Sequence, residues 1–264
     1  MSTGITRRGV LAGALTLPWL VGCGARTDRP AGVDLLEGTF TSSFWPDRQV
    51  RWRLARPAHQ GTPATPQPLV VALHGYGGDA GFPFNDVHIE RFVAPTGLAV
   101  ASVDGGDFYW HARKSGIDTG RMVVQDLLPL LAGKGLATDR IGLIGWSMGG
   151  YGALLLASTL GPSRVAGVVA VSPALWQSPG DSAPGAFDDS EDFARNDVFA
   201  RRPTLAAMPV RLDCGREDPF IVATRAFAGG LPSAAATFDD GAHTSEYWTS
   251  HAGAQMSWLA KRFR

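Results

Sequence analysis

The residue best placed to do chemistry in this sequence is Ser147, which lies in the G-x-S-x-G pattern of residues 145–149. Apolar residues precede the pattern over 141–144, and an Ala/Leu-rich stretch, 153–160, follows it. A strand, a sharp turn and a helix in this order form a nucleophile elbow, whose strained backbone lifts the serine hydroxyl above the sheet edge. Glycines on both sides leave room for neighbouring backbone. The pattern predicts Ser147 as a nucleophile; the alternative is a glycine-rich turn with an idle serine.

A serine hydroxyl needs a base, and the base needs an orienting partner. In folds with this elbow, an acid and then a histidine follow the serine along the chain. His243 and His251 both follow it. His243 comes after a predicted strand end and a glycine, at the carboxyl edge of the sheet where ligands bind. We therefore predict His243 as the base and expect His251 to lie on the face of the last helix.

The acid is expected just after the predicted strand 210–214. Asp218 lies in the loop that follows this strand, whereas Asp213 lies within the strand itself. Glu217 is adjacent and remains an alternative, as does Asp213. The alternative role for Asp218 is to cap the next helix, because an Asp before Pro is a good cap. The position of Asp218 past the strand end favours it as the acid of the triad.

An oxyanion that develops during acyl transfer needs two backbone N–H donors. The residue after the nucleophile, Met148, supplies one. The sequence His-Gly-Tyr-Gly-Gly at 74–78 follows the predicted strand 69–73, and its glycines let the backbone turn inward. We expect the amide of Tyr76 to be the second donor and His74 to be a structural residue of the loop.

Aromatic residues follow two other predicted strand ends at the same edge of the sheet. Tyr109 and Trp110 belong to one of these segments, and Trp176 belongs to the other. Aromatic side chains at such an edge are typical of a substrate cleft, so these three are candidate substrate-binding residues. The alternative is that they cover the core.

Apolar segments alternate with helical patterns along most of the chain, which predicts an α/β fold. A half-buried strand is expected at 50–54, and covered strands at 68–73, 98–103, 165–171 and 210–214. Helices are expected at 121–132 and 245–263, each with apolar residues on one face. This alternation predicts a mostly parallel sheet with helices on both faces. Residues 177–209, rich in Asp, Pro, Ser and Ala, are expected to form a small cap or surface excursion.

Composition limits the remaining possibilities. The 264 residues carry a formal net charge of zero and 45% hydrophobic residues, as suits one large domain. The charge gives no case for nucleic-acid binding. The six histidines and two cysteines show no metal-ligand spacing, so we expect neither a metal nor a cofactor. Cys214 lies in an apolar strand context and is expected to be a buried free thiol.

The first residues are typical of an export signal. Residues 6–11, Thr-Arg-Arg-Gly-Val-Leu, resemble a twin-arginine signal, and the apolar run 10–21 that follows ends in a lipobox-like Leu-Val-Gly-Cys at 20–23. Cys23 would then carry a diacylglycerol anchor on the outer face of the cell membrane; ordinary cleavage and secretion is the alternative. The chain is accordingly divided into a signal (1–23), a tether (24–35) and a catalytic domain (36–264).

Four motifs together resemble the esterase D and antigen 85 branch of the α/β hydrolases over residues 36–263. They are His-Gly-Tyr-Gly-Gly at 74–78, Gly-Trp-Ser-Met-Gly-Gly-Tyr-Gly-Ala at 145–153, G-x-x-D-x-F at 215–220 and G-x-H-x-x-x-Y-W at 241–248. This group includes carboxylesterases, S-formylglutathione hydrolases, feruloyl and xylan esterases, and mycolyltransferases. The resemblance implies a serine esterase with Ser147, Asp218 and His243 as its triad and the Tyr76 and Met148 amides as its oxyanion hole. An ester of the cell envelope is the expected substrate; acyl transfer and non-catalytic binding are the alternatives.

Overall fold

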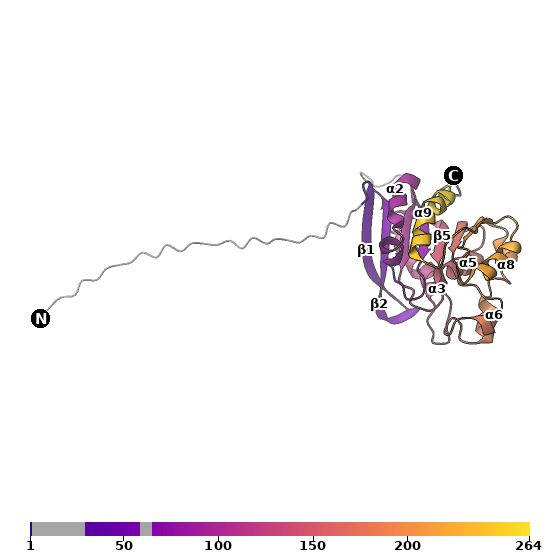
Figure 1. Cartoon of the computed structure of the whole chain (residues 1–264). Helices are drawn as coiled ribbons and strands as arrows, with labels where there is room; N and C mark the ends of the chain where they lie inside the picture. Colours follow the sequence, from indigo (N-terminus) through magenta and orange to yellow (C-terminus); the bar gives the residue numbers. More distant parts are fainter. Residues whose placement is uncertain (2–29, 59–64) are drawn as a thin grey trace.

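An eight-stranded sheet forms the centre of the computed structural model, which describes residues 1, 30–58 and 65–264 (Figure 1). The strands are β1 (Val33–Ser42), β2 (Trp45–Pro57), β3 (Gln67–Leu73), β4 (Ala99–Val103), β5 (Leu136–Trp146), β6 (Val165–Val171), β7 (Val210–Asp213) and β8 (Ala235–Thr237). Their order is β1-β2-β4-β3-β5-β6-β7-β8. The pairs β1–β2 and β2–β4 are antiparallel, and all other pairs are parallel. The predicted α/β class and mostly parallel sheet are confirmed.

Helices cover both faces of the sheet, which gives the domain two apolar cores. They are α1 (Phe82–Asn85), α2 (Val93–Thr96), α3 (Thr119–Met122), α4 (Leu128–Ala132), α5 (Met148–Leu160), α6 (Ser190–Asn196), α7 (Arg202–Leu205), α8 (Ile221–Gly229) and α9 (Ser245–Ala260), with the short η1 (Ile89–Phe92), η2 (Val123–Leu127) and η3 (Pro179–Asp181). Side chains alternate between faces along a strand. In β3, Val71 therefore joins the core with α5, and Val70 joins the core with α2 and α9.

The helix predicted at 121–132 is present but is not uniform. The turn of α3 continues directly into η2, a π-helical segment, and then into α4. Pro129 lies in the first turn of α4 and has no N–H to donate to the carbonyl four residues earlier. A wider turn before a proline accommodates the missing hydrogen bond, and this accounts for the π segment.

The boundary predicted for the tether is wrong by a few residues. The edge strand β1 begins at Val33, inside the segment 24–35 that was expected to be a linker. Gly38 pairs with Trp52 of β2, and a Cβ at Gly38 would lie 2.9 Å from that indole ring.

The predicted signal, including Cys23, lies outside the described residues. Among the described residues, no helix has the length and apolar character that a membrane crossing requires.

The expected excursion, 177–209, is fastened to the body of the domain through the segment 111–114. The Arg113 guanidinium binds Asp188 at 2.8 Å and donates to the carbonyls of Gly185 and Ala186 at 3.0 Å each. The main-chain N–H of Lys114 donates to Asp188 at 2.6 Å. In Figure 1 the excursion, marked by α6, lies at the end of the domain away from β1. The excursion is thus a fixed part of the fold.

Candidate active site

Ser147 lies between the end of β5 and the start of α5 in a backbone conformation that few residues adopt. Its φ is +54° and its ψ is −118°. A Cβ at Gly145 would lie 2.0 Å from the carbonyl oxygen of Gly149, and one at Gly149 would lie 2.0 Å from that of Leu73. Because both distances are far below van der Waals contact, only glycine fits at either position. The strained turn is held to β6 by a hydrogen bond from the Ser147 N–H to the Val171 carbonyl at 3.0 Å.

Ser147, His243 and Asp218 form one hydrogen-bonded chain. The Ser147 Oγ is 3.0 Å from His243 Nε2, and His243 Nδ1 is 2.9 Å from Asp218 Oδ2. The side chain of Asp218 is fully buried, whereas that of His243 is 25% exposed. The imidazole is flanked by Trp248 and Phe220, whose ring centroids lie 5.1 and 5.4 Å away. This packing holds the ring so that its two nitrogens face the serine and the carboxylate.

Asp218 is held as a carboxylate. Burial alone would raise its pKa, but hydrogen bonds from His243, the Phe220 N–H and Ser172 outweigh that effect and lower the pKa. Sequence reasoning did not identify Ser172, although it directly follows β6 at the carboxyl edge. Its hydroxyl also accepts a hydrogen bond from the Trp248 indole N–H at 3.0 Å. Ser172 therefore links the acid to the aromatic residue that packs on the base.

The two alternative acids are engaged elsewhere or exposed. Asp213 is buried at the end of β7 and binds Arg211 at 2.9 Å and the side-chain amide of Gln255 at 2.8 Å. Glu217 is exposed, and its main-chain N–H donates to the Gly241 carbonyl at 2.9 Å. Of the three carboxylates considered, the structure brings only Asp218 to His243.

The loop at 74–78 lies against the serine. A Cβ at Gly75 would lie 3.3 Å from the Ser147 Cβ, which shows how closely the two backbones approach. His74 is buried inside the loop, accepting from the Gly105 N–H at 2.9 Å, and burial lowers its pKa. Met148 is the first residue of α5, so its N–H has no acceptor within the helix. The segments that carry the Tyr76 and Met148 amides therefore border the same hydroxyl.

A cavity of about 510 Å³ opens beside the Ser147 hydroxyl. Its walls are residues 75–79 together with Phe82, Asn85, Asp86, Ser147, His243 and Trp248. Sequence reasoning missed Asp79, Phe82, Asn85 and Asp86 of this wall; the signal for them is that residues 79–86 directly follow the glycine-rich loop. Carboxylate, amide and aromatic side chains share the wall, so the cavity can hold a polar group against an aromatic face.

Two of the three candidate substrate residues are buried away from this cavity. Trp110 is only 2% exposed, and its ring fills the space above Gly105 and Gly152, where an added Cβ would lie 2.3 Å from it. The prediction that Trp110 lines a substrate cleft is therefore wrong: the indole is a core residue. Tyr109, only 4% exposed, is likewise part of the core and does not line this cavity. Trp176 is half-buried, and its ring centroid lies 5.8 Å from that of Phe220, which packs on His243. Trp176 therefore remains a candidate.

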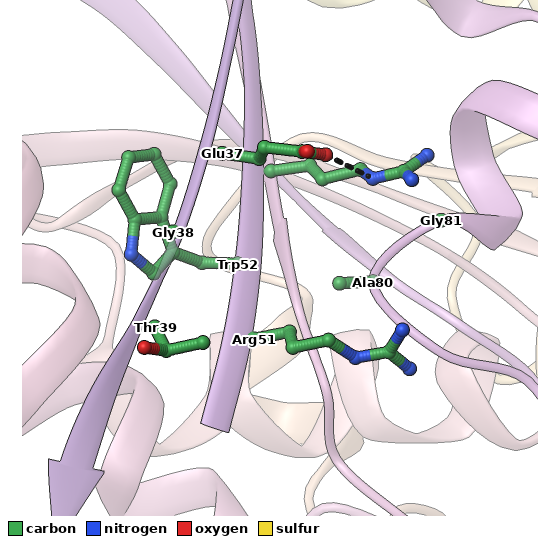
Figure 2. Close-up of a pocket in the computed structure, with 8 residues that line it drawn as sticks. Glu37, Gly38, Thr39, Arg51, Trp52, Ala80 and Gly81 are labelled. Atoms are coloured by element: carbon green, nitrogen blue, oxygen red, sulfur yellow. Dashed lines mark ion pairs between the residues drawn. The ribbon is translucent and has the colours of Figure 1, made fainter. Parts of the chain in front are cut away.

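A smaller pocket of about 220 Å³ is lined by residues 37–39, 51–53, 80 and 81 (Figure 2). The Arg51 and Trp52 side chains leave β2 on opposite sides, and the dashed line marks the ion pair of Glu37 with Arg53 at 3.2 Å. Arg51 also binds Asp79 at 3.0 Å, and Arg53 donates to Asn85 at 3.1 Å. These arginines thus support two residues of the cavity wall from behind.

Within the residues that the structure describes, no three His, Cys, Asp or Glu side chains are grouped as a metal site would require. Cys214 is a buried free thiol. Burial raises its pKa to about 12, so the thiol stays protonated at neutral pH and is a poor nucleophile.

Comparison with known proteins places this geometry in a family. The family model described as "Putative esterase" matches residues 46–252. Among solved structures, the serine hydrolase FphF of Staphylococcus aureus superimposes with a TM-score of 0.76 at 18% identity, covering 86% of this chain and 98% of its own. A ferulic acid esterase superimposes with a TM-score of 0.75 at 17% identity, and the match covers 89% of this chain and 99% of the esterase. The S-formylglutathione hydrolase FrmB of Staphylococcus aureus superimposes with a TM-score of 0.73 at 17% identity, and the match covers 86% of this chain and 99% of FrmB.

A search of curated proteins finds no match to the sequence. The family match extends over more than half of the chain and includes the elbow, the acid loop and the base loop. The chain therefore belongs to the putative esterase family and is an esterase with the α/β-hydrolase fold.

Proposed function

We propose that this esterase cleaves carboxylic esters through an acyl-enzyme on Ser147, with His243 as the base and Asp218 as the acid that orients it. The observation that carries the proposal is the chain of two hydrogen bonds, 3.0 and 2.9 Å long, on a strained glycine-flanked elbow. Serine, imidazole and buried carboxylate in this order are the arrangement that activates a hydroxyl at neutral pH.

The reaction follows from the positions of these atoms. Ser147 Oγ attacks the ester carbonyl carbon while His243 Nε2 takes the hydroxyl proton. The carbonyl oxygen becomes an oxyanion, which the amides of Tyr76 and Met148 stabilise. His243 returns the proton to the departing alcohol as the ester bond breaks. A water then repeats the sequence on the acyl-enzyme, releasing the acid and freeing Ser147.

The structure supports Asp218 as the partner of the imidazolium that forms in this cycle. Its buried carboxylate faces Nδ1, so it fixes the tautomer in which Nε2 is free to accept the serine proton. The lowered pKa of Asp218 keeps the carboxylate ionised at the pH at which His243 acts. Positive charge on the imidazole is therefore matched by a negative charge 2.9 Å away.

We expect a fluorophosphonate probe to label the folded protein once, at Ser147, and p-nitrophenyl acetate to be hydrolysed. The phosphonate phosphorus is attacked as the ester carbonyl would be, so labelling requires an activated serine. Mass spectrometry of the labelled peptide identifies the residue. Ser158→Ala is the matched control and should label normally: Ser158 lies on the same helix α5, donates to the Leu155 carbonyl and accepts from Arg201.

Folded protein that is not labelled would instead be a binding module. Product analysis with an added alcohol decides between water and a second alcohol as the final acceptor. Formation of a new ester in place of the free acid would assign the chain as an acyltransferase.

We further propose that the substrate is an ester of the cell envelope and that the protein is anchored there through Cys23. This rests on the twin-arginine pair and the lipobox-like run at 20–23. A diacyl anchor binds membranes stably, so the protein should fractionate with membranes and detergent. Cys23→Ser should release or misprocess it, while the isolated domain from residue 30 should keep its activity on small esters. Full-length protein found in the cytosol with residues 1–22 attached would contradict the export proposal.

A further inference from the structure

A second His–Asp pair lies next to the proposed triad but is not part of it. Asp239 lies four residues before His243, in the loop 238–244 that joins β8 to α9. His251 of α9 places its Nε2 2.9 Å from Asp239 Oδ2, and the Tyr247 hydroxyl donates to Asp239 Oδ1 at 2.8 Å. Both carboxylate oxygens of the loop residue are thus bound by side chains of the last helix.

The partners of His251 call for a proton on each ring nitrogen. Its Nε2 faces a carboxylate, and its Nδ1 lies 2.8 Å from the main-chain carbonyl of Tyr247. A carboxylate and a carbonyl only accept hydrogen bonds, so these contacts favour a proton on each nitrogen, as in an imidazolium. The Ser250 hydroxyl, 2.9 Å from Nδ1, itself donates to the same carbonyl at 2.8 Å. Two acceptors on one ring therefore make the pair with Asp239 ionic.

The same contacts fix the loop that carries His243. The main-chain carbonyl of Asp239 accepts from the Arg216 N–H at 2.8 Å, which ties it to the loop of the acid. Gly241 lies under the Tyr247 ring, where an added Cβ would approach within 2.3 Å. The loop is thus held at two points, two and four residues before His243.

We propose that Asp239 and His251 are positioning residues: their ion pair fixes the 238–244 loop on α9 and thereby keeps His243 Nε2 within hydrogen-bonding distance of the Ser147 hydroxyl. Neither residue touches the reacting atoms, so both act through the position of the base. The proposal rests on the proposed function, because it needs His243 to be that base.

The pair should make activity fall at alkaline pH. Burial opposes the charge on His251, but the hydrogen bonds to Asp239 and to the Tyr247 carbonyl, together with the charge of Asp239, raise its pKa above the ordinary value. Asp213 of β7 also faces the ring, and Arg211 already pairs with Asp213. A raised pKa means that the ionic tie is complete at pH values below about 6.5, the ordinary pKa of histidine. As pH rises through the raised value, the tie weakens to an uncharged hydrogen bond. The alkaline fall of the pH profile should therefore follow the deprotonation of His251.

The test compares Asp239→Asn with Asp240→Asn, using kcat and KM for p-nitrophenyl acetate and counting active sites by complete fluorophosphonate labelling. Asp240 is the matched control, because it is in the same loop but is exposed and pairs with the Arg216 side chain in place of a residue of α9. We expect Asp239→Asn to lower kcat about tenfold or more while KM changes less than twofold, since a displaced base slows chemistry without altering the cavity. Asp240→Asn should stay within twofold in both.

His251→Gln supplies the pH readout. An amide at 251 still donates to Asp239 but carries no charge and does not titrate. Near pH 6, kcat of this variant should therefore drop by up to about threefold, to the level that wild type reaches after its alkaline fall, and the fall itself should disappear. A purely structural role for His251 would lower thermal stability and leave the profile unchanged.

Two results would overturn the proposal: an Asp239→Asn variant as active as Asp240→Asn, or an alkaline fall that persists in His251→Gln. Ser147→Ala, assayed beside them, separates this failure from that of the proposed function. If Ser147→Ala is inactive and Asp239→Asn is not impaired, the triad stands and only the positioning role is wrong. An active Ser147→Ala variant would remove the triad, and this proposal with it.

Discussion

Replacing Ser147 with alanine should lower kcat for p-nitrophenyl acetate at least about a thousandfold, which corresponds to about 4 kcal/mol of transition-state stabilisation. Alanine removes the hydroxyl that lies 3.0 Å from His243 Nε2 and leaves the amides around it in place. The residual rate should come from these amides and from substrate binding, which act without the nucleophile.

The fold should survive this change because the glycines at 145 and 149, which the close backbone contacts require, are untouched. Circular dichroism and the thermal melting temperature check this directly. A folded Ser147→Ala variant with more than a tenth of the wild-type kcat would take the nucleophile role away from Ser147.

The second large effect is expected for Asp218→Asn, with a loss in kcat of about 10³ to 10⁴. An amide at 218 can hold the imidazole in the tautomer with Nε2 protonated, which cannot accept the serine proton. It also removes the charge that faces the imidazolium at 2.9 Å. Steady-state kinetics across pH 5 to 9 measure the loss, and KM should change little because Asp218 does not line the cavity.

Asp213→Asn is the informative comparison, since Asp213 was an alternative for the acid. Its carboxylate binds Arg211 and Gln255, so the substitution should lower the free energy of unfolding while kcat per folded molecule stays near the wild-type value. The opposite ranking, with Asp213→Asn catalytically worse, would show that the acid has been assigned to the wrong strand end.

Much of the sheet could be predicted because its strands are buried on both faces. Apolar runs such as 165–171 and 210–214 stand out from polar surroundings, and β6 begins and ends at the residues expected. The elbow could be predicted for a related reason, since only glycine fits beside Ser147 and this requirement is visible in the sequence. The order of serine, acid and histidine then left few candidates for each position.

What could not be predicted depends on contacts between distant segments. The edge strand β1 is only partly buried, so its apolar pattern is weak, and its first three residues were given to the tether. Trp110 follows a strand end as substrate residues do, but its burial depends on the glycines at 105 and 152. His251 looked like an ordinary helix-face residue because nothing in the local sequence shows that α9 returns to Asp239.

The fastening of the excursion 177–209 has a kinetic consequence. Its ties to Arg113 and Lys114 are supplemented by the Tyr151 hydroxyl, which donates to the Asn196 carbonyl at 2.9 Å, and by the Phe187 ring, stacked on His111 at 5.4 Å. Lipases that show interfacial activation carry a segment that swings away at an oil–water boundary. In this protein the excursion 177–209 is fixed to the body of the domain by these contacts, and the cavity beside Ser147 is open. We therefore expect dissolved monomeric esters to be turned over without a prior gating transition, at a rate that does not depend on micelle formation.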